Sequence, residues 1–197
     1  TGKDSLSMKQ KYPNDEVIAP GTVIITAGGN CTDIRKVVEP VLQRDGGSIY
    51  YINLSQDEFK LGGSSFAQTL NAIGKDAPTI KDAAFFKKAF NTIQELILED
   101  NILAGHDIGS GGLITTLLEM CFADNNLGAK IDFSVFEEKD IIKYLFAENI
   151  GIVFQAKDDA SLENKLNTNG VSFYKLGAAT SEATLDFGPC KLDIAKY

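Results

Sequence analysis

The chain has 197 residues, of which 44% are hydrophobic and 23% are charged, as is usual for globular domains. Its formal net charge is −8, from 27 acidic and 19 basic residues. This balance argues against a broad nucleic-acid-binding surface, which needs clustered Lys and Arg. No apolar run approaches the roughly 20 residues that a membrane span requires. We therefore expect neither nucleic acid nor a membrane as a partner.

In the first half of the chain, apolar spacing predicts strands and helices in alternation. The run GTVIITAGG is rich in β-branched residues and lies between Pro-Gly and Gly-Gly pairs, which predicts a buried strand. SIYYINLS predicts a second strand, and two later segments have apolar residues at helical spacing. The expected elements are strands at 21–29 and 48–55 and helices at 62–74 and 79–101.

The helix expected at 79–101 is the longest in the chain. Thr79 and Asp82 are expected to form its N-terminal capping pair, with Asp in place of the usual Glu. Seven apolar residues can share one face of this helix and are expected to be buried: Ile80, Ala84, Phe86, Phe90, Ile93, Leu96 and Ile97.

The second half of the chain continues the alternation. Its last two strands follow each other closely and are expected to form a hairpin. We predict an α/β or mixed α+β fold, with a central mixed sheet and packed helices, as one domain over residues 1–197. The expected elements are a short strand or turn at 102–105, strands at 129–136, 151–157, 172–180 and 183–188, and helices at 111–123, 140–149 and 158–170.

The three cysteines, Cys31, Cys121 and Cys190, bear on the cellular compartment. They are far apart, odd in number and without Cys-x-x-Cys spacing, which argues against a zinc site or a disulfide framework. Reduced thiols in a cytoplasmic protein fit best. The first residues, TGKDSLSM, contain neither an initiator Met nor a signal-peptide pattern. We expect a cytoplasmic piece excised from a longer multidomain chain.

The segment HDIGSGGL begins a predicted helix with a glycine-rich turn. A helix start presents unpaired N–H groups at the positive end of the helix dipole. Glycines let an oxyanion approach the backbone closely, and Ser110 adds a hydroxyl. We therefore predict phosphate contacts at Gly109, Ser110, Gly111 and Gly112. The alternative is a turn that starts a helix and binds nothing; the spacing is not that of a P-loop.

Asp107 precedes this turn and is the predicted metal ligand. Magnesium bound to the phosphates of a nucleotide prefers oxygen ligands such as this carboxylate. The alternative is an aspartate that caps the turn. Adjacent residues of a strand point to opposite sides, so His106 and Asp107 are not expected to form a catalytic dyad. His106 is assigned to orientation or packing, and no catalytic residue is assigned.

Two further segments carry candidate phosphate contacts. In GKDSLSM, Lys3 can neutralise a phosphate and Ser5 lies beside it; the alternative is a solvated end of the chain. LGGSS is a second glycine-rich helix start, which makes Gly62, Gly63 and Ser64 candidates on the same reasoning as above. Taken together, the segments predict a partial nucleotide or phosphate-ester site.

Four blocks now point to a family. GKDSLSM, LGGSSFAQ, HDIGSGGLITTLLEMCFA and FAENIGIVFQ resemble, in that order, blocks of phosphoribosylformylglycinamidine synthase in its large single-chain form. The resemblance spans Gly2 to about Gln155 and continues more weakly beyond. The chain looks like the second C-terminal-type domain of the core of that enzyme, which implies a fold like the C-terminal domain of aminoimidazole ribonucleotide (AIR) synthetase.

The resemblance implies an activity for the full-length protein. The family uses ATP, Mg²⁺ and ammonia from glutamine to convert formylglycinamide ribonucleotide to formylglycinamidine ribonucleotide in de novo purine biosynthesis. The implied protein is thus an ATP-dependent C–N ligase with a ribonucleotide substrate. Its partners are the missing domains of the same chain, a glutaminase domain among them. The piece alone is expected to be inactive.

The resemblance also bears on the site residues. Asp107 resembles a Mg²⁺ ligand at a nucleotide site that holds ADP in the large form. Gly109 stands where the family usually has Ser, and Ser110 where it has Asp. These departures leave open a structural nucleotide-binding module with a decayed site. A related ATP enzyme of the same fold, such as selenophosphate synthetase or a hydrogenase maturation protein, is a further alternative, against which GKDSLSM argues.

Overall fold

A computed structural model of the chain describes residues 2–5, 8–19, 22–31, 33–124 and 126–197; the side chains of residues 2–5 and 22 lie outside that description. The chain divides into two units, residues 1–35 and 36–197. Each unit is described by itself, and a single domain over residues 1–197 stays a prediction.

The first unit consists of two antiparallel ribbons. β1 (Gly2–Ser5) pairs with β4 (Thr22–Ile25), and β2 (Met8–Lys11) pairs with β3 (Glu16–Ala19). A strand was expected at 21–29, but the prediction that it is buried is wrong, since Ile25 is 80% exposed. A β-branched run favours a strand, whereas burial also needs a second layer, which a two-stranded ribbon does not provide.

The second unit is built on a seven-stranded sheet with the strand order β11-β10-β7-β9-β5-β8-β6. Neighbouring strands are antiparallel except β10 and β7, which are parallel. This mixed sheet with packed helices confirms the predicted fold class. The strands are β5 (Ser48–Asn53), β6 (Ile102–Asp107), β7 (Gly128–Ile131), β8 (Gly151–Ala156), β9 (Tyr174–Thr180), β10 (Thr184–Asp186) and β11 (Lys191–Asp193).

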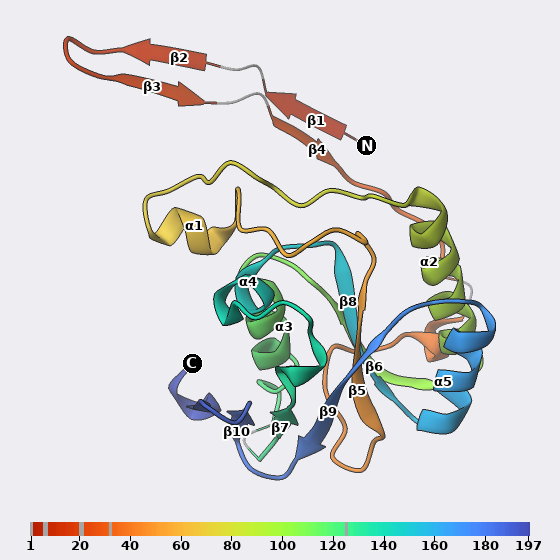
Figure 1. The fold of residues 1–197 in the computed structure, drawn as a ribbon. Helices are drawn as coiled ribbons and strands as arrows, with labels where there is room; N and C mark the ends of the chain where they lie inside the picture. Colours follow the sequence, from red (N-terminus) through yellow and green to blue (C-terminus); the bar gives the residue numbers. More distant parts are fainter. Residues whose placement is uncertain (1, 6–7, 20–21, 32, 125) are drawn as a thin grey trace. The chain divides into compact units, whose positions relative to one another are not determined.

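Helices cover both faces of this sheet (Figure 1). α3 (Gly112–Glu119) and α4 (Ile141–Phe146) lie on one side, and α2 (Ala83–Leu98) and α5 (Asp159–Thr168) lie on the other. The short α1 (Ser65–Thr69) lies in the connection between β5 and α2. No helix among the described residues is both long and apolar enough to cross a membrane.

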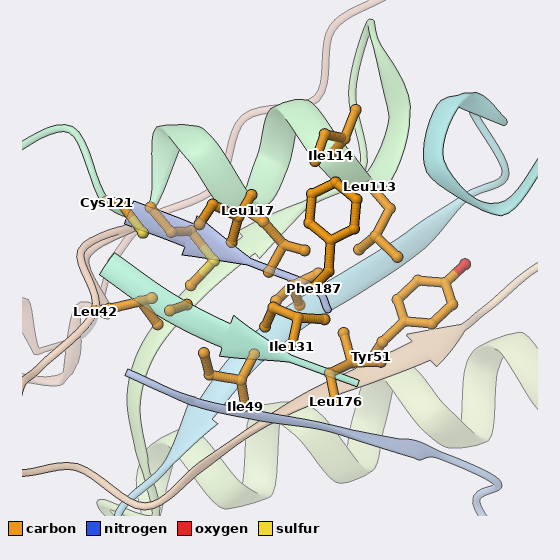
Figure 2. Close-up of a cluster of buried hydrophobic side chains, with 14 of the residues drawn as sticks. Leu42, Ile49, Tyr51, Leu113, Ile114, Leu117, Cys121, Ile131, Leu176 and Phe187 are labelled. Atoms are coloured by element: carbon orange, nitrogen blue, oxygen red, sulfur yellow. The ribbon is translucent and has the colours of Figure 1, made fainter. Parts of the chain in front are cut away.

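The alternation of side chains along β5 divides the interior into two hydrophobic cores. Ile49 and Tyr51 belong to the core under α3 and α4, whereas Tyr50 and Ile52 belong to the core under α2 and α5. Figure 2 shows the first core, in which the buried Cys121 lies beside leucine and isoleucine side chains. All three cysteines are free thiols.

Helix α2 begins later than expected, and its buried face differs from the predicted one. Asp82 alone is its N-cap and accepts the Phe85 N–H at 2.8 Å, while the Thr79 N–H donates to Asp57. The predicted Thr79–Asp82 capping pair is therefore wrong. Of the predicted face, Phe90 is 49% exposed. The residues of α2 that are buried are Phe85, Ala89, Thr92, Ile93 and Leu96.

The hairpin expected from 172–180 and 183–188 is also wrong. Both strands form, but β7 lies between β9 and β10 in the sheet. β10 instead makes an antiparallel pair with β11. The proximity of two strands in sequence did not reveal that a strand from the middle of the chain separates them.

The buried Gln155 of β8 extends the sheet through its side chain. Its amide accepts the Gln43 N–H at 2.7 Å and donates to the Gln43 carbonyl at 2.8 Å, which is the two-bond pattern of an antiparallel pair. A Cβ on Gly46 would lie 2.4 Å from the Gln155 side chain. The turn before β5 can therefore close over this amide only because residue 46 is glycine.

Candidate functional site

The predicted site lies where β6 leaves the edge of the sheet and α3 begins. Asp107 is the last residue of β6 and pairs with Ile152 of β8. The next N–H, of Ile108, donates to the Gly151 carbonyl at 3.0 Å. Strand pairing thus fixes the backbone up to residue 108 and directs the glycine-rich turn toward α3.

The carboxylate of Asp107 is exposed, while its backbone is held firmly. Its side chain is 85% exposed, and its carbonyl accepts the Thr116 hydroxyl of α3 at 3.1 Å. The His106 ring lies 3.3 Å from the Asp107 carboxylate and 3.4 Å from that of Glu119. The Nδ1 atom of His106 lies closer, at 2.8 Å, to the backbone carbonyl of Asp107. The expectation that His106 and Asp107 form no catalytic dyad stays a prediction.

The four predicted turn residues, 109–112, differ in how they are used. Gly111 and Gly112 have φ values of 90° and 74°, in the left-handed region that favours glycine. A Cβ on Gly112 would lie 2.7 Å from the Leu145 carbonyl, so this glycine lets α4 pack closely. Gly109 has nothing within 4 Å of its Cβ position. Among the described residues, the Gly109 and Ser110 N–H groups have no acceptor. Phosphate contact at this turn stays a prediction.

The second glycine-rich segment uses its N–H groups within its own loop. Gly62 donates to the Asp76 carbonyl at 3.0 Å and Gly63 to the Ile73 carbonyl at 2.7 Å. The hydroxyl of the buried Ser64 donates to the Leu61 carbonyl and accepts the Ala67 N–H, which makes it the N-cap of α1. These bonds explain the LGGSS pattern as a folded turn, and its contact with phosphate stays a prediction.

The candidate residues of GKDSLSM lie in the first unit. Lys3 and Ser5 belong to β1, opposite Ile24 and Thr22 of β4. Their side chains lie outside the described part of the chain. Their predicted contact with phosphate stays a prediction.

The structure joins the two glycine-rich segments of the second unit through Glu148, which the sequence analysis missed. One of its carboxylate oxygens accepts the Gly111 N–H at 2.9 Å and the Ser65 N–H at 2.7 Å. Beside it, the Phe146 and Phe66 rings stack with centroids 4.7 Å apart. The signal in the sequence was the acid of FAEN, which lies within the helix expected at 140–149 but after the observed end of α4 at Phe146.

The neighbouring Asn149 is buried and anchors a third segment. Its amide donates to the Ser55 hydroxyl at 3.1 Å and to the Glu58 carbonyl at 3.0 Å. In that segment, burial acts to raise the pKa of Asp57, but hydrogen bonds from Lys60 and from backbone N–H groups outweigh it, so the pKa is lowered. FAEN therefore fixes the loop after β5 as well as the two glycine-rich turns.

Two cavities border this loop, and the second is lined in part by the predicted contact residue Gly62. The first encloses about 600 Å³ and the second about 410 Å³, within the size range of small-molecule sites. The first is acidic, with Asp57, Glu58, Glu137 and Glu138 among its lining residues. The second is lined by apolar residues, among them Phe59, Leu61 and Phe66, and by charged residues of both signs, among them Lys75, Lys143 and Asp76.

The described residues supply one oxygen donor at the predicted metal site. They contain no group of three or more His, Cys, Asp or Glu side chains arranged to hold a metal ion. Mg²⁺ is commonly held by one or two carboxylates, with phosphate oxygens and water completing its shell. The exposed Asp107 carboxylate fits one ligand of such an ion.

Comparisons with known proteins give a consistent result. Residues 44–187 match the family described as AIR synthase related protein, C-terminal domain. A probable phosphoribosylformylglycinamidine synthase of Arabidopsis thaliana, named chloroplastic/mitochondrial, is 37% identical over 94% of this chain. Phosphoribosylformylglycinamidine synthase of Homo sapiens is 35% identical over 89% of this chain. The chain spans only 13% of the length of each.

Solved structures show the same fold. PurL of Thermotoga maritima complexed with FGAR superposes with a TM-score of 0.62 at 16% identity, covering 92% of this chain and 31% of that one. Phosphoribosylformylglycinamidine synthase II of the same organism gives 0.59 at 13% identity, covering 91% and 29%. The hydrogenase maturation protein HypE gives 0.50 at 15% identity, covering 75% and 51%. At such identities the likeness concerns the fold alone.

Proposed function

The chain belongs to the AIR synthase related protein family, C-terminal domain, and from this we propose that it is the second C-terminal-type domain of a large phosphoribosylformylglycinamidine synthase. The observation that carries the proposal is the 35–37% identity to proteins of that name across 89–95% of the chain. The full-length protein would convert formylglycinamide ribonucleotide to formylglycinamidine ribonucleotide, with ATP and glutamine as co-substrates.

Within that enzyme, the proposed role of this domain is to hold ADP or ATP with Mg²⁺ at the turn between β6 and α3. The N–H groups of Gly109 and Ser110 would donate to phosphate oxygens, because they have no acceptor among the described residues and lie just before the start of α3. Asp107 would supply one ligand to Mg²⁺, which when bound balances the negative charge of the phosphates. Gly111 and Gly112 would shape the turn. In support, PurL of T. maritima has been solved with ATP and with ADP.

The proposal includes the parts of the protein that lie outside this chain. Other domains, including a glutaminase that releases ammonia, would complete the enzyme, which fits the small share of the relatives that the chain spans. Further phosphate contacts would come from Lys3, Ser5, Gly62, Gly63 and Ser64. The 197-residue chain alone would have no synthase activity, and the protein would be cytoplasmic.

One observation favours the alternative of a structural module with a decayed nucleotide site. Glu148 already places a carboxylate against the Gly111 N–H. Together with Gly109 and Ser110 in place of the family's Ser and Asp, this weakens the case for a catalytic pocket. A module of this kind would fold as observed and bind nucleotide weakly or not at all.

Asp107→Asn in the full-length protein tests the proposal. The isosteric amide removes the charge, so the nucleotide and Mg²⁺ that copurify with the protein should fall, and Mg-ADP should bind more weakly by calorimetry. Asp45→Asn is the matched control, because Asp45 is another exposed aspartate. Unchanged nucleotide content, metal content and melting temperature in Asp107→Asn would exclude a metal role for Asp107. Absence of amidine formation by the unmodified full-length protein would exclude the proposed activity.

A further inference from the structure

We propose that Glu148 is a positioning residue: it fixes the two glycine-rich segments to each other and, by occupying the Gly111 N–H, restricts the turn to phosphate that carries a divalent cation. The inference deepens the proposed function and rests on it for the identity of the ligand. Glu148 lies outside the segments that are predicted to contact phosphate. Its positioning role can therefore be tested in the absence of any ligand.

The first step is the shared carboxylate oxygen. Gly111 and Ser65 both donate their N–H groups to the same oxygen of Glu148, at 2.9 and 2.7 Å. Hydrogen bonds to a charged acceptor are stronger than those between neutral groups. A side chain that accepts hydrogen bonds from two segments fixes the distance between them. A movement of one segment therefore displaces the other.

The second step is the rigid support of Glu148. Helix α4 ends at Phe146, and the extended Ala147 (φ −68°, ψ 133°) turns the chain toward the two segments. The Phe146 ring stacks on Phe66 of α1, and the backbone of Phe146 lies against Gly112. On the other side, the buried Asn149 is hydrogen-bonded to the loop after β5. Glu148 is therefore held by packing on both sides and does not simply follow its donors.

The third step is the charge around the turn. Glu148 already provides the negative charge that the start of α3 favours. The Asp107 carboxylate is exposed at the end of β6, two residues before Gly109. A bare phosphate approaching Gly109 and Ser110 would meet the like charges of Asp107 and Glu148. A phosphate that carries Mg²⁺ would meet less repulsion, because the cation offsets its charge and Asp107 would supply that cation with one ligand.

The test uses the ¹⁵N-labelled 197-residue chain and follows the amide signals of residues 65 and 111 by NMR. Glu148→Gln keeps the shape and one acceptor but loses the charge, so both signals should shift together. Glu137→Gln, at an exposed glutamate, is the control and should move neither. Ser65→Pro removes only one donor at a helix position that tolerates proline, and it should shift the Gly111 signal through Glu148. Signals that do not respond in Glu148→Gln and Ser65→Pro would overturn the positioning role.

Ligand titrations then test the restriction on phosphate, with Mg-ADP and with ADP in EDTA as probes. In the unmodified chain, Mg-ADP should shift the Gly109 and Ser110 signals, and ADP in EDTA should bind about tenfold more weakly, as expected from like charges a few ångströms away in exposed surroundings. Glu148→Gln should reduce the difference in affinity between Mg-ADP and ADP in EDTA. An unchanged difference in affinity would overturn the restriction to phosphate that carries a divalent cation. If neither probe binds any variant, the proposed nucleotide role and the restriction both fail, while the signals of residues 65 and 111 still decide the positioning role.

Discussion

Gly112 lies directly against Phe146: a Cβ on Gly112 would be 2.8 Å from the Cα of Phe146. The first turn of α3 and the last turn of α4 thus meet backbone to backbone. This contact gives Gly112 a structural role that is independent of any ligand.

Replacing Gly112 by alanine should destabilise the chain strongly. The residue has φ 74°, where an L side chain is strained, and its Cβ would overlap the end of α4. We expect a loss of about 2–4 kcal/mol in the free energy of unfolding, measured by urea denaturation. Gly109→Ala is the matched control and should stay within about 0.5 kcal/mol, because nothing lies within 4 Å of its Cβ position. Equal losses in the two variants would contradict the packing argument.

Replacing Asn149 by alanine should also destabilise the chain. The Asn149 side chain is buried and donates to the Ser55 hydroxyl and the Glu58 carbonyl, so alanine removes these hydrogen bonds and leaves a cavity in their place. The expected loss is about 2–4 kcal/mol by urea denaturation, since each lost hydrogen bond costs about 0.5–1.5 kcal/mol and the cavity adds to it. Asn167→Ala, at an exposed position of α5, serves as the control and should change stability little. A loss of the same size at Asn167 would exclude the buried network as the cause.

Asp159 should make stability depend on acid pH. Burial acts to raise the pKa of its carboxyl, but hydrogen bonds from Lys175 and Ser48 outweigh it and lower the pKa to about 2. The unfolded value is about 3.9. The folded state is therefore favoured above about pH 4, and this contribution is lost as the pH falls through 2. Asp159→Asn should lower stability at pH 7 and flatten its decline between pH 4 and 2, measured by thermal unfolding. Asp45→Asn should leave this decline in stability unchanged. A steep decline in stability between pH 4 and 2 that persists in Asp159→Asn would show that other groups cause it.

The three thiols should differ in reactivity. Burial raises the pKa of Cys121 to about 12, so at pH 8 it is protonated as well as shielded. Cys31 and Cys190 are exposed. Iodoacetamide should therefore modify two thiols in the folded chain and all three in denaturant, counted by mass spectrometry. Rapid modification of Cys121 in the folded chain would show that the core under α3 opens readily.

Local pattern predicted most of the elements of the second unit, because apolar periodicity reflects which side of an element is buried. It failed where the outcome depends on partners far away in sequence. The strand at 22–25 forms, but its burial depends on a layer that a two-stranded ribbon lacks. The hairpin failed because β7, from the middle of the chain, inserts between β9 and β10. The face predicted for α2 was wrong in part: Ile80 lies before the helix, which starts at Ala83, and Phe90 is exposed.

The candidate site follows the same rule. Asp107 and the turn after it were recognised because they are contiguous and carry residue types that suit a phosphate. Glu148 was missed because its two partners lie 37 and 83 residues away, and no local spacing connects a single acid with two backbone N–H groups. The carboxylate that closes the Gly111 position appears only once the sheet has brought α4 beside α3.

The side-chain pairing of Gln155 with Gln43 has a consequence for the order of folding. The two residues are 112 positions apart, so the turn before β5 cannot be stabilised while it is synthesised or while it collapses locally. Its closing contact exists only after β8 has paired with β5, and contacts between distant residues form slowly. The turn at Gly46 should thus acquire protection from hydrogen exchange at the same rate as the centre of β8 and later than helix α2, although it precedes both in the chain.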